Sequence, residues 1–316
     1  MISNETHSTA VAAEPKPAEG ACLLCGQNNG TAAWEENGYQ AKFCEACGVL
    51  YLDPAAPEEA VDATFEQHDD SYYGRPAKVR ADWLATVRPS GHLLEVGCGS
   101  GHFLDECRRR GYEVAGCEVD PGRARYCREE LDIEVETAYV EDSQLPEHSF
   151  DIVFHVDLLS HFPDPVKSLR AMTRLLKPGG VLCFEAGTLG GMSSRWYRWN
   201  GGLGCPDHRW FYSLDGIRNV IDRADLQIDS MRQYGLVPAM LPLVFGRTFV
   251  KPVVRLLKGK DARPWEGTVD TGAGPLRQVH GIYRLGTWVE FQLRYRLGPY
   301  VPKFGPTTLF IAASPK

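Results

Sequence analysis

The chain has 316 residues, of which 43% are hydrophobic and 24% are charged. These values are typical of globular proteins, and they exclude a mostly disordered chain, a collagen and a coiled coil. The net charge of -7 is uneven, because from residue 231 onward there are 13 Lys and Arg against 4 Asp and Glu. The acidic remainder argues against DNA and RNA as partners. The basic C-terminal part favours an anionic substrate or a membrane surface, or is simply a solvated basic face.

The N-terminal residues 1–20 are rich in Ala, Pro, Glu, Ser and Thr and lack the apolar core of a leader peptide. This composition predicts a disordered tail. No run reaches the ~18 apolar residues of a membrane span. We therefore expect a cytoplasmic protein without a transmembrane segment. In that compartment the ten cysteines are expected to be metal ligands or small buried side chains rather than disulfides.

Four cysteines form two C-x2-C pairs separated by 18 residues: Cys22 and Cys25, then Cys44 and Cys47. Each pair can present two thiolates from one tight turn, and two such turns complete a tetrahedral Zn2+ site. A glycine follows the second cysteine of each pair, as knuckle turns favour. With four thiolates no coordination position is open to a substrate, so the predicted zinc is structural. The alternative is a loosely ordered loop of reduced thiols.

A short apolar strand, His92 to Val96, leads into the glycines Gly97, Gly99 and Gly101 and then into a helix that ends near Arg110. Glycines allow a sharp turn and a close approach of the backbone to a ligand. The following strand ends at Glu118, 19 residues after Gly99. A carboxylate at that position suits the two hydroxyls of a ribose.

Strands and helices then alternate, which predicts a parallel sheet with helices on both faces. Further strands are expected at 133–138, 150–154, 181–185, 226–231 and 308–312, and helices at 76–87, 121–131, 165–176, 214–224 and 277–297. The segment 177–180, Lys-Pro-Gly-Gly, is expected to end a helix.

The glycine turn alone would suit NAD, FAD or S-adenosylmethionine. Its G-x-G-x-G spacing differs from the G-x-G-x-x-G of dinucleotide sites, and Glu95 adds an acid that a pyrophosphate would disfavour. Together with Glu118, Phe150-Asp151 and the segment 175–180, the motif resembles class I S-adenosylmethionine-dependent methyltransferases over about residues 90–230. The four-cysteine start resembles a subgroup with an N-terminal zinc ribbon, which includes sugar C-methyltransferases and other natural-product enzymes.

The resemblance implies an α/β, Rossmann-like, seven-stranded sheet with a zinc ribbon and inserted lid helices. The implied parts are a tail at 1–20, a ribbon at 21–55, a methyltransferase domain at 56–234 and 306–316, and a lid at 235–305. The implied cofactor residues surround the glycine turn and the ends of the next strands. They are Glu95 for the methionine ammonium, Gly97, Cys98, Gly99 and Gly101 for close approach, Glu118 and Val119 at the ribose, Glu141 or Asp142 at the adenine, and Phe154 and His155 beside the methyl group.

Methyl transfer requires alignment of the acceptor and removal of its proton, for which histidine is the usual base. His155, His161 and His208 follow strands of the predicted sheet. Asp207-His208 matches an acid-histidine pair of the zinc-ribbon sugar methyltransferases, so we expect His208 to be the base. His161 and His155 are second choices. Each of these histidines would alternatively be a capping, structural or cofactor-side residue.

Two insertions, 187–212 and 235–305, are expected to cover the acceptor. The second is apolar, aromatic and basic, which favours a hydrophobic acceptor with negative charge, such as a polyketide, prenyl or acyl compound on a phosphate or carrier. The same residues would equally pack the insertion onto the body or form a homodimer interface. At 316 residues the chain is expected to be too short for the further C-terminal domain of the sugar C-methyltransferases, which counts against a deoxysugar as the acceptor.

The sequence therefore predicts an S-adenosylmethionine-dependent methyltransferase that acts on an oxygen or carbon of a natural-product or cell-envelope precursor. Two rivals remain. An rRNA methyltransferase is disfavoured by the acidic body, and a catalytically inactive binding module is disfavoured by the intact cofactor motif.

Overall fold

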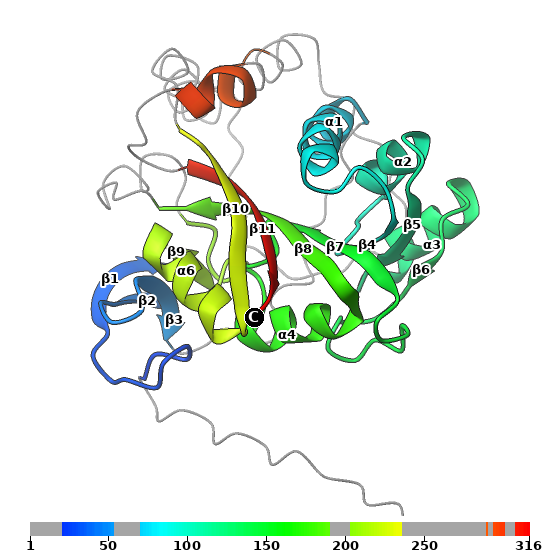
Figure 1. Ribbon diagram of the computed structural model, residues 1–316. Coiled ribbons are helices and arrows are strands. Elements are labelled where there is room, and N and C mark those ends of the chain that lie inside the picture. The colour runs from blue at the N-terminus through cyan, green and yellow to red at the C-terminus, as the bar shows by residue number, and fades with distance from the viewer. Residues whose placement is uncertain (1–20, 54–69, 190–202, 236–288, 290–292, 301–306) are drawn as a thin grey trace, which may run out of the picture.

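The computed structural model describes residues 21–53, 70–189, 203–235, 289, 293–300 and 307–316 (Figure 1). Its described strands form a seven-stranded sheet, in the order β10-β11-β8-β7-β4-β5-β6, and a four-stranded sheet, β1-β2-β3-β9. The larger sheet is mostly parallel, as the sequence predicts. The exception is β11, which runs antiparallel to both of its neighbours, β8 and β10.

The strands of the larger sheet follow the predicted order along the chain. They are β4 (His92–Val96), β5 (Glu113–Cys117), β6 (Val135–Glu136), β7 (Phe150–Val156), β8 (Leu176–Thr188), β10 (Leu226–Tyr234) and β11 (Thr307–Pro315). Because β4, β7 and β8 are adjacent and parallel, their carboxyl ends share one edge of the sheet. In open α/β sheets that edge is where ligands bind.

Helices cover both faces of this sheet (Figure 1). One face packs against α1 (Asp70–Val87), α2 (His102–Arg109) and α3 (Pro121–Glu130), with Trp83, Phe103 and Phe154 in the core between them. The other face packs against α4 (Pro165–Leu175) and α6 (Leu214–Arg223), whose buried residues include Met172 and Ile221. This is the three-layer arrangement expected from alternating strands and helices.

Three helices begin directly after a residue whose side chain caps the first turn. Asp120 and Asp164 each precede a proline at the first helical position, and their carboxylates accept hydrogen bonds from backbone amides of the first turn. Ser213 caps α6 through a hydrogen bond from the amide of Gly216. Such caps satisfy amide groups that have no partner within the helix.

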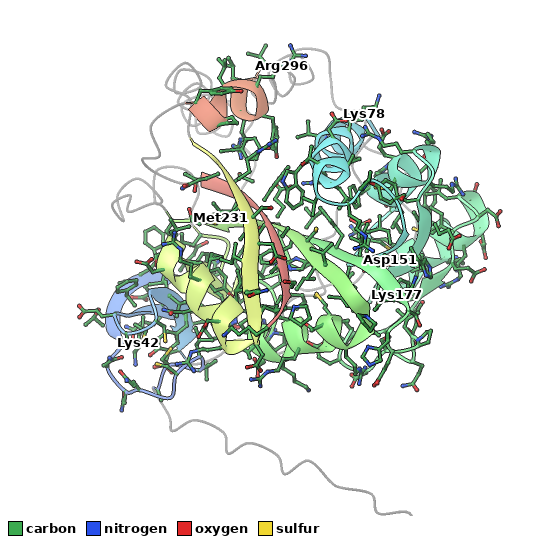
Figure 2. The ribbon with its side chains drawn as sticks, in the orientation of Figure 1. Lys42, Lys78, Asp151, Lys177, Met231 and Arg296 are labelled. Atoms are coloured by element: carbon green, nitrogen blue, oxygen red, sulfur yellow. The ribbon has the colours of Figure 1, made fainter. Side chains whose placement is uncertain are left out.

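The segment Lys177-Pro-Gly-Gly180 departs from its prediction. It was expected to stop a helix, but it forms the first part of β8, and a register irregularity in the β7–β8 pairing accommodates it. At this end of the sheet the Nζ of Lys177 lies 2.8 Å from Oδ2 of Asp151 (Figure 2). The hydrogen bond from Lys177, helped by the amide of His92, lowers the pKa of Asp151. The ion pair thus links β7 to β8 at the end of the sheet opposite the carboxyl ends of β4 and β7.

The smaller sheet contains β1 (Thr31–Glu36), β2 (Tyr39–Cys44), β3 (Val49–Asp53) and β9 (Trp210–Tyr212), all antiparallel. The pairing of β9 with β3 was not predicted, because it joins residues about 160 positions apart. Trp210, Phe211 and Tyr212 were expected in a lid, but they are buried where this sheet meets the body.

Most of the two predicted covers lies outside the described residues. Of the helix expected at 277–297, residues 293–297 are helical and are followed by the 3-10 turn Gly298–Tyr300. Tyr295 packs edge-on against Tyr234 of β10, with ring centroids 5.1 Å apart. Helix α1 begins at Asp70, earlier than the predicted residue 76, and contains Pro76. Across the described ranges, no helix combines the length and apolarity that a membrane crossing requires.

Candidate active site and cysteine cluster

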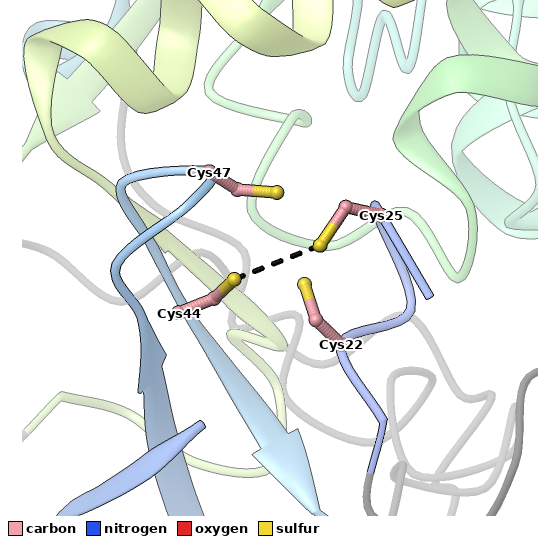
Figure 3. A group of neighbouring side chains, drawn as sticks. All are labelled: Cys22, Cys25, Cys44 and Cys47. Atoms are coloured by element: carbon pink, nitrogen blue, oxygen red, sulfur yellow. Dashed lines mark hydrogen bonds between the residues drawn. The ribbon is translucent and has the colours of Figure 1, made fainter. Parts of the chain in front are cut away.

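Four thiols converge at the N-terminus, as the sequence predicts (Figure 3). The ligand atoms of Cys22, Cys25, Cys44 and Cys47 all lie within 4.8 Å of one another. The Sγ atoms of Cys25 and Cys44 are 3.7 Å apart. Zn–S bonds of about 2.3 Å in a tetrahedron place two sulfurs about 3.8 Å apart, so the spacing suits zinc. The glycines after the knuckles, Gly26 and Gly48, have φ values of 73° and 70°, which favour glycine.

The cysteine cluster contacts the body through Gly48. The carbonyl of Gly48 accepts a hydrogen bond from the amide of Ser213, the residue that caps α6. A Cβ at Gly216 would lie 2.4 Å from the Gly48 oxygen, so the second knuckle sits directly on the first turn of α6. Asn219 of the same helix donates to the carbonyl of Cys47 at 2.8 Å. The cluster therefore lies where the small sheet docks onto the body.

The glycine turn after β4 has the conformation that a closely bound ligand requires. Gly97 has a φ of 67°, and a Cβ there would lie 2.5 Å from Cδ1 of Leu158, which is part of the turn after β7. Gly99 has a φ of 55°, and its Cβ position is open except for an Arg123 nitrogen at 3.9 Å. Because neither residue has a Cβ, the turn after β7 can approach the backbone at Gly97, and the space beside the backbone at Gly99 remains open.

Glu118 lies beside this turn with 4% of its surface exposed. Its Oε2 accepts a hydrogen bond from the amide of Gly99 at 2.7 Å, and its Oε1 accepts one from the amide of Asp120 at 3.0 Å. These two bonds fix the plane of the carboxylate. Each oxygen retains a further lone pair, so the group can still accept from a diol. Val119 is half-buried next to it.

Glu95 is an almost fully buried acid at the end of β4, and its Oε2 makes no hydrogen bond within the described structure. Burial raises its pKa well above the usual range, although the positive charge of Arg80 opposes the shift. Arg80 comes from α1 and donates from Nε to Oε2 of Glu185 at 2.6 Å. An unsatisfied buried acceptor of this kind suits a cationic ligand group.

The two acids predicted to lie at the adenine, Glu141 and Asp142, differ in their surroundings. Glu141 is half-buried and accepts a hydrogen bond from the hydroxyl of Ser168 in α4, whereas Asp142 is exposed. Both follow β6 at the sheet edge. Cys98, between the first two glycines, is 6% exposed, and its Sγ lies 2.7 Å from where a Cβ on Gly116 would be. Cys98 thus packs inward against β5.

Two predicted residues on β7 lie inside the body. Phe154 is 1% exposed and packs on Phe103, with ring centroids 4.3 Å apart. His155 is fully buried and stacks on Phe184 at 4.8 Å, and burial lowers its pKa to about 3. Neither ring nitrogen of His155 has a hydrogen-bond partner in the described structure. A neutral imidazole in the core is poorly placed to take a proton from an acceptor.

The other predicted catalytic residues meet in one cluster. The Nδ1 of His161 lies 3.3 Å from Oδ1 of Asp207 and 3.1 Å from the backbone oxygen of Asp207. The rings of His161 and His208 are 4.4 Å apart between centroids. Asp207 therefore pairs with the distant His161 rather than with its neighbour in sequence. We refer to His161, Asp207 and His208 as the His-Asp-His cluster.

The two imidazoles of the cluster have opposite protonation tendencies. Burial disfavours a charged His161, but the hydrogen bond and charge of Asp207 outweigh it and raise the pKa of His161. Burial and then the charge of His161 lower the pKa of His208. Near neutral pH, His208 is consequently the imidazole that remains uncharged and able to accept a proton.

Strand β9 holds the cluster in place. The carbonyl of Ser160 accepts hydrogen bonds from the amides of Arg209 and Trp210. The indole of Trp210 donates to the carbonyl of Phe162 at 2.9 Å, and the hydroxyl of Tyr212 donates to that of Leu159 at 2.8 Å. The turn that carries His161 is thereby fixed on both sides against the segment that carries His208.

Asp157 is a further acid at this edge that sequence reasoning missed. It directly follows β7, is exposed, and adopts a φ of 54°. Charged groups of both signs lie near its carboxylate: Glu185 has the same charge, and His161 and Arg80 have the opposite one. The position of Asp157 directly after a strand could have identified it as a candidate site residue. The nearby histidines were preferred because histidine is the more common catalytic base.

Comparisons with known proteins agree with this arrangement. Residues 94–184 match the family model described as a methyltransferase domain. The chain is 39% identical over 99 residues to a ubiquinone biosynthesis O-methyltransferase of Alkalilimnicola ehrlichii, covering 29% of this chain and 40% of that protein. It is 36% identical over 112 residues to the protein of the same name from Xanthomonas campestris pv. campestris, covering 33% and 47%. The chain thus spans less than half the length of these curated relatives.

A solved structure supports the fold alone. The crystal structure of MccD protein superposes with a TM-score of 0.50 at 12% identity, covering 76% of this chain and 98% of that one. The larger sheet, which contains the residues matched by the family model, shares its fold with that structure. Residues 94–184 thus match a methyltransferase domain, and a four-cysteine cluster precedes them in the chain.

Proposed function

We propose that the protein transfers the methyl group of S-adenosylmethionine to an oxygen of a small-molecule acceptor. The observation that carries the proposal is the close approach of Leu158 to Gly97, because Leu158 belongs to the same turn as His161, whose amide donates a hydrogen bond to the carbonyl of Leu158. The names of the curated relatives, which are O-methyltransferases, favour oxygen as the acceptor atom. Transfer to carbon is the remaining alternative from the zinc-ribbon resemblance.

The cofactor residues fit the proposed ligand. The open backbone at Gly99 would admit its amino-acid end, with Gly97 and Gly101 shaping the turn and Cys98 packing beneath it. The buried, unsatisfied Oε2 of Glu95 would accept from the ammonium, and Glu118 with Val119 would hold the ribose. Glu141 or Asp142 would accept from the adenine amine. When bound, the cofactor supplies an activated sulfonium methyl group.

The protein's own task is then to align the acceptor and remove its proton. We assign the base role to His208, because its lowered pKa keeps the imidazole neutral. His161, held by Asp207, would orient the acceptor beside it. His155 and Phe154 would act from the core as packing residues, not as contacts of the methyl group.

Zinc is the second part of the proposal. The four thiols at tetrahedral spacing would hold one structural Zn2+ that ties the small sheet to α6. Residues 21–55, with β9 added, would form the ribbon. The residues 56–234 and 306–316 would form the methyltransferase domain, and 235–305 would cover the acceptor. The apolar and basic composition of that cover favours a hydrophobic, anionic acceptor of natural-product or envelope metabolism.

The test is methyl transfer to a panel of phenols, catechols and hydroxy acids, each beside its O-blocked analogue. We expect transfer from labelled cofactor only to acceptors with a free hydroxyl, and a product with the methyl group on oxygen. Replacement of the base, His208→Gln, should lower turnover by about 10^2 to 10^4 with cofactor affinity unchanged. Transfer to carbon, or equal transfer by the variant, would contradict the assignment.

A further inference from the structure

The His-Asp-His cluster has the composition of a metal site that is separate from the cysteine cluster. One ligand atom from each of His161, Asp207 and His208 lies within 4.8 Å of the other two. Two imidazoles and a carboxylate are the protein ligands of many three-ligand zinc and non-haem iron sites. Such sites keep a coordination position open for water or a small molecule.

The spacing within the cluster supports this interpretation. Metal–ligand bonds of about 2.0–2.1 Å in a tetrahedron place two ligand atoms about 3.3 Å apart. The Nδ1 of His161 and Oδ1 of Asp207 are 3.3 Å apart. The ring of His208 is tilted by 44° against that of His161, with centroids 4.4 Å apart, and one of its nitrogens lies within 4.8 Å of the ligand atoms of both other residues.

The backbone around the cluster is fixed by contacts outside it. Ser160 and β9 hold the turn that carries His161, and the amide of His208 donates to the carbonyl of Gly204 at 3.0 Å. Gly204 has a φ of 84°, and a Cβ there would lie 2.7 Å from Nδ1 of His208. The three ligands thus come from two segments whose positions do not depend on an ion. A site formed in advance in this way lowers the ordering cost of binding.

We propose that the His-Asp-His cluster binds one divalent transition-metal ion, such as Zn2+ or Co2+, and that the bound ion inhibits methyl transfer. Binding itself is independent of the proposed function. Inhibition rests on the proposed function, because a metal ion on His208 occupies the lone pair that would receive the acceptor's proton. The metal-free cluster is then the active form.

The experiment is a titration of the full-length, zinc-loaded protein with Co2+, followed by absorption spectroscopy and calorimetry. We expect one further equivalent with d–d bands but without the thiolate charge-transfer band that cobalt at cysteines would give. The near-isosteric Asp207→Asn and His208→Gln should each weaken this binding by at least about tenfold. His148→Asn is the matched control, since it removes an exposed imidazole at a left-handed position that Asn tolerates.

Two results would overturn the metal site. One is wild-type protein that takes up no ion beyond the cysteine cluster. The other is equal affinity of wild type and both cluster variants, with all three showing native circular dichroism. If the ion binds but does not slow turnover, the inhibition is wrong while the site stands. If the protein fails to bind S-adenosylhomocysteine, the proposed function fails without any effect on the metal count.

Discussion

The carboxylate of Glu36, at the end of β1, accepts hydrogen bonds from the backbone amides of Leu203 at 2.7 Å and Gly204 at 3.1 Å. Gly204 lies four residues before His208 and receives the hydrogen bond from its amide. The small sheet therefore reaches the candidate active site through this side chain as well as through β9, which begins two residues after His208. The cysteine cluster and the His-Asp-His cluster are two parts of one structural unit.

Loss of the Glu36 carboxylate should disturb this link. In Glu36→Gln the side-chain amide group would face backbone donors, and we expect a loss of about 1.5–3 kcal/mol in the free energy of unfolding, as for hydrogen bonds to charged groups. Turnover should fall while affinity for S-adenosylhomocysteine stays unchanged, because Gly97 and Glu118 are not touched. Chemical denaturation and calorimetry measure the two quantities.

The matched control is Glu35→Gln, which changes an exposed acid on the same strand. It should leave stability and turnover as in the wild type. Equal effects of the two substitutions would show that Glu36 contributes only surface charge.

The zinc proposal predicts one equivalent of zinc by elemental analysis of the purified protein. Cys44→Ser should lose that zinc, and the free energy of unfolding should fall by more than about 4 kcal/mol, as loss of a structural metal can cause. Cys205→Ser is the control, since Cys205 is also buried and packs against residues of the small sheet but lies outside the cluster. A folded wild-type protein without metal would contradict the ribbon.

The pH profile of turnover should report His208. Because its pKa is lowered, the imidazole is already neutral at pH 7. The value of kcat/KM should therefore be flat from neutral to mildly alkaline pH and fall only in acid, below about 6.5, the ordinary histidine value. His208→Gln should lose the acid limb along with most activity. A profile that rises through pH 7 to 8 would point to a base with an unlowered pKa.

The His161–Asp207 pair should make stability depend on pH. Its stabilisation needs both charges. The pKa of His161 is raised, so its contribution is complete below the unfolded histidine value and disappears as the pH rises through the folded value. The pKa of Asp207 is lowered, so its contribution is present above the unfolded aspartate value and disappears in stronger acid.

Asp207→Asn should consequently destabilise the protein by roughly 1 kcal/mol between about pH 4.5 and 6, and by less at pH 9. Thermal unfolding of wild type and variant at the two pH values measures the difference. Asp215→Asn, which removes an exposed acid from the first turn of α6, provides a comparison. A loss for Asp207→Asn that is the same at both pH values would mean that the pair is not charged.

Local motifs were the predictable part of this protein. The two C-x2-C pairs, the glycine turn and the acid at Glu118 depend on short spacings, and each lies where its pattern indicated. The alternation of strands and helices likewise fixed the parallel part of the larger sheet. Even there, the segment 177–180 became strand, because pairing with β7 outweighed the turn preference of Pro and Gly.

Partners chosen by tertiary packing were not predictable in the same way. Asp207 was matched with its neighbour His208, but the backbone places its carboxylate on His161, 46 residues away. Arg80 and Glu185 meet from α1 and β8, and nothing in either local sequence indicates the pair. The addition of β9 to the small sheet is of the same kind, since short strands gain their partner only from the folded context.

The most direct test of the account is the affinity for S-adenosylhomocysteine, measured by calorimetry on the wild type, Glu118→Ala and Glu113→Ala. Glu113 is an exposed acid at the start of β5, the strand that precedes Glu118, and serves as control. We expect binding by the wild type and the control, and its loss in Glu118→Ala with the protein still folded. A folded wild type that does not bind, or a Glu118→Ala variant that binds as tightly, would contradict the cofactor site.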